Sequence, residues 1–262
     1  MDLQLEGKHV FITGGAGGIG FACAQEFRNE GCRLTLAGRE QPQLDKARQA
    51  LGADEREVAT LLVELSDPAD ALRAINQAEA ALGPIDVLIN AAGAARQIPF
   101  AELEPNDWRA ALDAKFMTYI NVIDPLIKRM AERGSGSIVN IIGLGGKLPI
   151  TTHLTGGAAN AALMLATAGL AMAYAPQGVR VNGINPAKTE TDRVAQNAIA
   201  QARQNNISVD EVLAKARKSA PIGRLATPQD IAAAATFLAS PRSAYISGTI
   251  LTVDGATRPV IV

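Results

Sequence analysis

The chain has 262 residues, a length that suits one large α/β domain. Hydrophobic residues make up 48% of the sequence, aromatic residues only 4%, and there are 24 glycines, which is typical of an aliphatic core with many tight turns. The formal net charge of −1 gives no basis for binding nucleic acid or an anionic membrane, and we expect neither partner.

A single domain spanning residues 1–262 is expected, because no Pro/Ser-rich tract, charge block or repeat divides the sequence. The sequence shows no signal-peptide pattern, and its two cysteines indicate a reducing compartment, so we expect a cytoplasmic location. Cys23 and Cys32 lack metal-ligand spacing and are interpreted as buried apolar residues, and no metal site is predicted. Residues 158–175 are apolar enough to suggest a membrane span, but their many small side chains favour a helix packed closely within a protein.

Short β-rich runs alternate with helical patterns along the chain. We expect strands at residues 10–12, 33–37, 61–63, 85–89, 137–142, 179–184 and 249–253, and helices at residues 21–29, 43–51, 68–82 and 108–132. Strands with few polar positions alternating with helices predict a parallel sheet of about seven strands with helices on both faces. This doubly wound, Rossmann-like α/β fold binds ligands beyond the carboxyl ends of its strands.

A glycine-rich turn, TGGAGGIG at residues 13–20, joins the first expected strand to the first expected helix. The three informative glycines, Gly14, Gly18 and Gly20, allow a tight turn, close approach of a pyrophosphate and close packing of the helix on the strand. The helix N-terminus offers N–H groups and the positive end of its dipole to phosphates. We therefore predict a dinucleotide site whose contacts include these glycines and Ile19.

Further motifs follow in a specific order: NAAG at residues 90–93, GSIVN at 136–140, VRVN at 179–182, PAKTET at 186–191 and VDG at 253–255. With them the chain resembles the short-chain dehydrogenase/reductase family over nearly its whole length. The resemblance implies a nicotinamide dinucleotide cofactor. It implies that Asn90 and Gly93 lie beside the cofactor, Glu64 near its adenine, and Pro186 and Thr191 in the loop near its nicotinamide.

The end of the second strand bears on the choice between NAD and NADP. The resemblance implies an acidic residue near Gly38 in members specific for NAD, and glycine neither binds the ribose hydroxyls nor repels a phosphate. Arg39 beside it suits a 2′-phosphate, because a guanidinium binds phosphate oxygens as a fork. NADP is therefore preferred over NAD, with a solvated arginine as the alternative; the basic residue that some NADP-binding members carry before Gly18 is Gly17 here.

Four positions that carry catalysis in this family hold other residues here. The resemblance places Gly156 at the position of the family's tyrosine, Asn160 at its lysine, Gly143 at its serine and Lys115 at its asparagine. A glycine cannot donate a proton, so the mechanism of the family does not transfer directly to this chain.

Two residues offer a replacement chemistry. Lysine and asparagine are exchanged between positions 115 and 160, which approach each other in the family, so Lys115 either supplies its ammonium from the opposite wall of the pocket or turns to solvent. His153 lies where family members commonly face the substrate, and a pKa near neutrality suits an acid/base residue; the alternative is a histidine bonded within its loop. Weaker candidates are Tyr119 and Lys147 for catalysis and Arg96 for binding an acidic substrate.

The sequence leads to three functional hypotheses. The first is an NADP(H)-dependent oxidoreductase with atypical catalytic residues, acting on a small-molecule carbonyl or alcohol. The second is a non-redox enzyme, such as a lyase or isomerase, and the third is a non-catalytic nucleotide-binding homologue. We also expect a substrate lid at residues 192–221, and a homodimer or homotetramer formed through the helices at residues 108–132 and 158–175.

Overall fold

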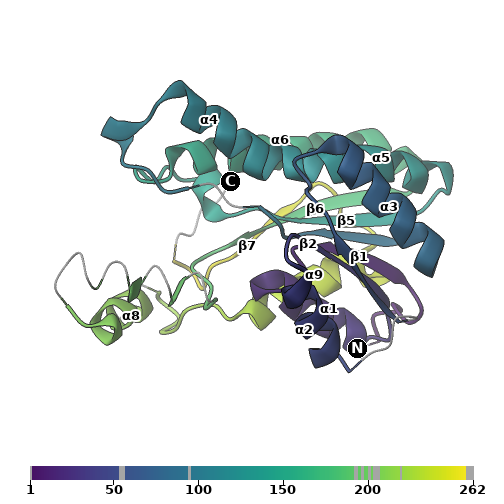
Figure 1. The fold of residues 1–262 in the computed structure, drawn as a ribbon, viewed down its shortest axis with the longest axis horizontal. Helices are drawn as coiled ribbons and strands as arrows, with labels where there is room; N and C mark the ends of the chain where they lie inside the picture. Colours follow the sequence, from purple (N-terminus) through teal and green to yellow (C-terminus); the bar gives the residue numbers. More distant parts are fainter. Residues whose placement is uncertain are drawn as a thin grey trace.

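The computed structural model describes residues 2–52, 57–93, 96–191, 207–218 and 220–257, together with residues 194, 195, 198, 199 and 202. Seven strands form one parallel sheet in the order β3-β2-β1-β4-β5-β6-β7, as Figure 1 shows. The strands are β1 (His9–Thr13), β2 (Arg33–Gly38), β3 (Val58–Leu62), β4 (Val87–Asn90), β5 (Gly136–Ile141), β6 (Val179–Pro186) and β7 (Ile250–Val253). The predicted doubly wound α/β fold is confirmed.

Helices cover both faces of the sheet (Figure 1). On one face lie α1 (Gly18–Asn29), α2 (Gln41–Ala50) and α9 (Pro228–Ala239), and on the other lie α3 (Pro68–Leu82), α5 (Thr118–Glu132) and α6 (Leu154–Tyr174). The short helix α4 (Pro105–Ala111) precedes α5, and α8 (Val209–Lys218) projects away from both layers. Short 3₁₀ turns occupy Phe100–Glu102, Leu144–Gly146, Ala175–Gln177 and Pro241–Ser243.

The register of the central strands aligns their carboxyl ends at one edge of the sheet. Thr13, the last residue of β1, lies opposite Ala37 of β2 and Asn90 of β4, and Asn90 in turn lies opposite Asn140 of β5. All five residues of β1 are buried because helices cover both faces, which explains its apolar sequence. The loops at this edge are therefore brought together, as expected for a ligand site in this fold.

Some predicted elements differ from the structure. The third strand begins earlier than the predicted residues 61–63, because β3 pairs with β2 from Val58 onward. The expected single helix at residues 108–132 is interrupted by a π-helical turn at Leu112–Met117. The hydroxyl of Thr118 donates to the carbonyl of Lys115 (2.9 Å), and this local bond competes with the regular helical ladder.

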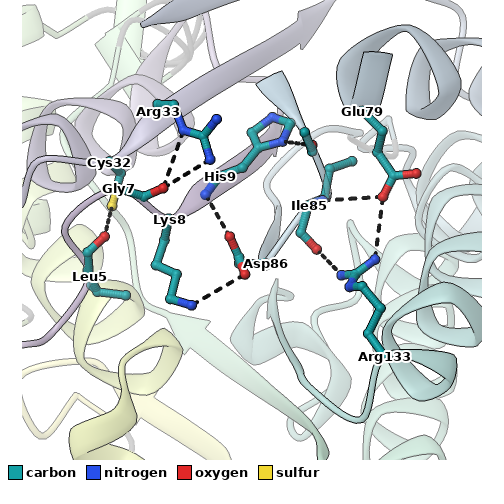
Figure 2. Close-up of polar contacts among 11 residues, drawn as sticks. Leu5, Gly7, Lys8, His9, Cys32, Arg33, Glu79, Ile85, Asp86 and Arg133 are labelled. Atoms are coloured by element: carbon teal, nitrogen blue, oxygen red, sulfur yellow. Dashed lines mark hydrogen bonds and ion pairs between the residues drawn. The ribbon is translucent and has the colours of Figure 1, made fainter. Parts of the chain in front are cut away.

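The amino ends of the strands are held by a separate polar network, shown in Figure 2. The backbone N–H of His9 donates to Asp86 Oδ2 (2.9 Å), as Figure 2 shows. The His9 ring contacts Gly83 O through Nδ1 (2.7 Å) and Thr35 Oγ1 through Nε2 (2.9 Å). His9 is fully buried and begins β1, whereas the glycine turn follows the other end of that strand. Its position gives it a structural role, distant from the ligand edge.

Helix α6 and the residues after it, Leu154–Gln177, are long and apolar enough to cross a membrane by length and composition alone. Core helices of soluble proteins pass the same test. One face of α6 packs on the sheet layer and carries buried polar groups, among them Thr167, which bonds to Asn140 of β5 (3.0 Å). The opposite face exposes Leu165 and Met172.

Candidate active site

The glycine turn packs so tightly that side chains would collide with backbone. A Cβ on Gly14 would lie 3.1 Å from the backbone of Ala92, and one on Gly20 would overlap the carbonyl oxygen of Gly14. Gly18 has φ = 51°, in the left-handed region that favours glycine. Its neighbour Gly17 is the N-cap residue of α1 and has no side chain to cap it, so the first N–H groups of the helix face no capping side chain. These features fit a dinucleotide pyrophosphate.

A buried polar network holds the loop after β4. Thr13 Oγ1 donates to Asn90 Oδ1 (3.3 Å) and accepts from the N–H groups of residues 91–92 (3.1 and 3.2 Å). Asn90 Nδ2 donates to Asn140 Oδ1 (3.0 Å), and Asn140 Nδ2 donates to Thr167 Oγ1 (3.0 Å). The side chain of Asn90 is thus fully buried and bonded at both ends, and it fixes the backbone that borders the glycine turn.

The ends of β2 and β3 lie side by side, since Gly38 pairs with Leu62. Arg39 follows directly and is exposed to solvent. A Cβ on Gly38 would lie 3.3 Å from the side chain of Leu44, which leaves little room for a larger residue. Glu64 accepts the hydroxyl of Ser66 (2.8 Å) and thereby stabilises its own turn at this edge.

The loop after β6 crosses from the far half of the sheet to the glycine turn. β6 ends at Pro186, and the N–H of Ala187, where the family has glycine, donates to the carbonyl of Val253 in β7 (3.1 Å). The methyl group of Thr191 would lie 3.4 Å from a Cβ on Gly18. The loop therefore borders the start of α1, where Ile19 packs partly buried against the core.

The imidazole of His153 fills the space beside Gly156. A Cβ on Gly156 would overlap the ring, and a Cβ on Gly145 would lie 3.6 Å from its Cδ2 atom. The ring therefore lies between the first turn of α6 and the loop after β5. Its Nδ1 atom is buried and has no hydrogen-bond partner within the described ranges.

Position 143 is built for glycine. Gly143 has φ = 134°, and a Cβ there would lie 3.0 Å from Asn160 Nδ2. Its N–H donates to Asn185 Oδ1 (3.1 Å). A serine at this position would be strained and would crowd Asn160, which is 6% exposed.

Lys115 is buried, with only 8% of its surface exposed. Its Nζ donates to Tyr119 Oη (2.7 Å) and to the carbonyl of Ile141 (3.0 Å), and the Tyr119 hydroxyl donates to the same carbonyl (2.6 Å). The π-helical turn carries Lys115, and Gly93 packs against this turn because a Cβ there would overlap the carbonyl of Ala114. The alternative in which Lys115 turns to solvent is wrong.

A cavity of about 860 Å³ lies beyond the carboxyl ends of β5, β6 and β7. Four residues singled out by the sequence line it: Gly143, His153, Asn160 and Pro186. Its wall is largely apolar and includes Ile142, Leu144, Leu148, Ile150, Ile222 and Leu225. Ala216 of α8 also lines it, so part of the expected lid segment borders the cavity; residues 192–193, 196–197, 200–201, 203–206 and 219 of that segment lie outside the described residues.

Burial and charge act on His153. Burial lowers its pKa most, the nearby ammonium of Lys115 lowers it further, and the backbone of Arg96 opposes both effects. Lys115 is thus close enough to influence His153 without itself lining the cavity. The side chains of Arg96 and Lys147 do not line it either.

No role was predicted from the sequence for the charged residues of the cavity wall. Arg224 binds both carboxylate oxygens of Asp230 (2.5 and 2.9 Å) and holds the pKa of that carboxyl well below its usual range. Thr227 and Asp230 form a capping box at the start of α9, a pattern visible in the sequence. Lys188, two residues after Pro186, also lines the cavity.

The two cysteines have no part in this site. Both are buried, and burial raises the pKa of Cys23 and of Cys32 to about 12, as expected for apolar core residues. In the described ranges, no group of three His, Cys, Asp or Glu side chains is arranged to hold a metal ion.

The chain matches known proteins over its whole length. A family model described as enoyl-(acyl carrier protein) reductase matches residues 14–256. A 3alpha-hydroxysteroid dehydrogenase of Mediterraneibacter gnavus is 31% identical over 98% of this chain and 100% of its own length. A D-threitol dehydrogenase of Mycolicibacterium smegmatis is 32% identical over 97% of this chain and 94% of its own length. The structure of L-sorbose reductase from Gluconobacter frateurii, complexed with NADPH and L-sorbose, has a TM-score of 0.93 at 27% identity and covers 100% of both chains.

Proposed function

The chain belongs to the short-chain dehydrogenase/reductase family, and from that premise we propose that it is a divergent member that moves a hydride between NADP(H) and a carbonyl or alcohol substrate. One observation carries the proposal. The glycine turn and the cavity lie at the same edge of the sheet, and the loop at residues 186–191 borders both. A dinucleotide phosphate at the turn and a small-molecule substrate in the cavity are thus brought into reach of each other.

NADP is the preferred cofactor, with NAD as the alternative. The tight turn around Gly14, Gly18 and Gly20 suits a pyrophosphate, and the exposed guanidinium of Arg39 at the end of β2 suits a 2′-phosphate. The absence of an acidic side chain at Gly38 removes the group that would repel that phosphate. The L-sorbose reductase structure holds NADPH, which agrees with this preference.

His153 is the proposed proton-handling residue. When bound, the nicotinamide supplies or accepts the hydride. The lowered pKa of His153 keeps its imidazole neutral at pH 7, the form that accepts a proton from an alcohol. In the reverse direction the imidazolium donates its proton to the substrate oxygen, and it forms only as the pH falls toward the lowered pKa of His153, below the ordinary value of about 6.5. Lys115 adjusts this equilibrium through its charge, and Asn160 lines the same wall to orient the substrate.

The remaining cofactor assignments come from the family resemblance. We propose that the backbone of Gly93 and Ile19 contacts the cofactor and that Asn90 supports the adjoining loop. Glu64 is placed near the adenine and Thr191 near the nicotinamide. The lid at residues 192–221 and the cytoplasmic location belong to the proposal as well. Ala216, from α8, supports the lid because it lines the cavity.

A homodimer or homotetramer is also proposed. Leu165 and Met172 on the outer face of α6 are 78% and 80% exposed, and Trp108 on α4 is 40% exposed. A second copy would bury these side chains. Sedimentation of the protein at micromolar concentration tests this, and a strictly monomeric species would count against it.

The function is tested by binding and turnover together. NADPH and NADH are titrated by thermal shift, where a bound cofactor raises the midpoint of unfolding. Gly18→Asp should abolish this shift, because it adds bulk and negative charge at the pyrophosphate site. Turnover is then measured by nicotinamide absorbance over carbonyl and alcohol panels, and His153→Ala should lower it by about a hundredfold with little change in cofactor affinity. Binding without turnover would favour the lyase, isomerase or non-catalytic alternatives, and no binding would overturn the proposal.

A further inference from the structure

Lys188 is a cation on the wall of a largely apolar cavity. It lies two residues beyond the end of β6 at Pro186, in the loop that borders both the cavity and the glycine turn. Other parts of the cavity wall come from the loop after β5, which contributes Leu144 and Leu148, and from the segment after α8, which contributes Ile222. Lys188 lines the cavity while remaining exposed to solvent, so an anionic group of a molecule bound in the cavity can approach its ammonium.

The other charges of the cavity wall are already engaged. Arg224 binds both carboxylate oxygens of Asp230, so this pair is internally neutral. Asp254 Oδ1 accepts the N–H of Ala256 (3.0 Å) within its own turn. For Lys188, by contrast, no hydrogen bond or ion pair is present within the part of the chain that the structure describes. Its ammonium is therefore available to a ligand.

We propose that the substrate is a bulky apolar carbonyl compound or alcohol that carries an anionic group, such as a carboxylate, and that Lys188 binds this group. The inference rests on the proposed function, since it names the substrate class of the same cavity. The cavity of about 860 Å³ includes Pro186, beside which the nicotinamide is proposed to lie, and the rest of its largely apolar lining suits a hydrocarbon body. The Lys188 ammonium donates to the anionic oxygens, while His153 and Asn160 face the reacting end.

A phosphate of the cofactor is the competing source of negative charge, because Thr191 of the same loop lies against Gly18. The two sources make different predictions. If Lys188 binds the substrate, Lys188→Met lowers the affinity for the substrate and leaves the affinity for NADPH unchanged. If it binds the cofactor, NADPH affinity falls instead.

The experiment uses bulky apolar ketones as matched pairs, each offered as the carboxylate and as its methyl ester. Binding to the full chain saturated with NADPH is measured by calorimetry, and turnover is followed in parallel. In the wild type the carboxylate should bind about tenfold more tightly than the ester. Lys188→Met should remove this preference and Lys188→Arg should retain it. Lys218→Met, which removes a charge from α8 outside the cavity lining, should leave it unchanged.

The outcomes separate this inference from the proposed function. A carboxylate preference that depends on Lys188 supports the inference, even where no turnover is seen and the proposed function fails. Equal binding of carboxylate and ester, a preference that survives in Lys188→Met, binding of neither compound, or a loss of NADPH affinity in Lys188→Met would each overturn it. Turnover of neutral ketones alone would leave the oxidoreductase proposal standing without a role for Lys188.

Discussion

The imidazole ring of His153 occupies the volume that a side chain at Gly156 would need, so the two positions are sterically linked. They lie three residues apart at the start of α6, a spacing that places side chains on one face of a helix. A side chain at position 156 would therefore have to displace the imidazole of His153. Restoring the family's tyrosine at 156 alone would displace the ring rather than rebuild the usual site.

This steric link predicts that Gly156→Ala destabilises the protein. The added methyl group must displace the imidazole, and overpacking of this kind costs about 1–3 kcal/mol. Gly169→Ala is the matched control on the same helix, because a Cβ there meets nothing within 4 Å. It should stabilise by up to about 1 kcal/mol, the usual gain of alanine over glycine in a helix. Urea unfolding measures both.

A double variant tests the cause. In a His153→Ala background the ring is absent, so the cost of Gly156→Ala should largely disappear, and the two changes should not be additive. The same cost in both backgrounds would show that something other than His153 excludes the side chain.

The sequence predicted the elements whose signals are local. The helix at residues 68–82 was placed correctly because Pro68 suits its first turn, with Asp67 capping it, and Gly83 follows its end. The helix at residues 108–132 was predicted without its π-helical turn, against which Gly93 packs from a loop distant in the sequence.

The candidate site likewise combines features that local sequence predicts and features that tertiary packing determines. The glycine spacing at residues 13–20 is a local pattern and predicted the phosphate cradle. The orientation of the Lys115 side chain is set by its hydrogen bonds to Tyr119 and to the carbonyl of Ile141, which lies on another element. The sequence therefore did not decide between a buried and an exposed Lys115. The ring of His153 was expected near the substrate, but its fit beside Gly156 depends on tertiary packing.

Arg39→Ala should weaken NADPH more than NADH. The guanidinium is exposed at the end of β2, where a charge-assisted bond to a 2′-phosphate is worth about tenfold or more in affinity. NADH lacks that phosphate, so its affinity should barely change. Titration of both cofactors checks this, with Lys46→Ala, an exposed cation on α2, as the control. Equal losses for the two cofactors would refute the phosphate contact.

Lys115→Met should move the pH dependence of catalysis. The ammonium of Lys115 lowers the pKa of His153, so removing it should raise that pKa toward its ordinary value. The acid limb of the pH–rate profile should therefore shift to higher pH in the variant. Circular dichroism and thermal melting check that the variant folds, because Lys115 is buried. An unshifted limb in a folded, active variant would mean that His153 is not the titrating group.

The stability of the fold should fall in mild acid because of His9. Gly83 O is only an acceptor, so His9 Nδ1 carries the proton, and Nε2 accepts from the hydroxyl of Thr35 in the neutral ring. Burial lowers the pKa of His9, so the unfolded chain binds a proton more readily than the folded one. Its contribution is fully present above the unfolded pKa of about 6.5 and is lost as the pH falls through that value toward the lowered one.

His9→Gln isolates this effect, because glutamine keeps a donor and an acceptor but does not titrate. Urea unfolding is followed from about pH 7.5 to about pH 5, and the wild type should lose more stability over this range than the variant. His153 also has a lowered pKa and contributes to the pH dependence of stability, so His153→Ala serves as the second comparison. This variant should retain the part of the pH dependence that is due to His9. If the free energy of unfolding of the wild type and of His9→Gln depended on pH in the same way, protonation of His9 would not be the cause of the loss of stability in acid.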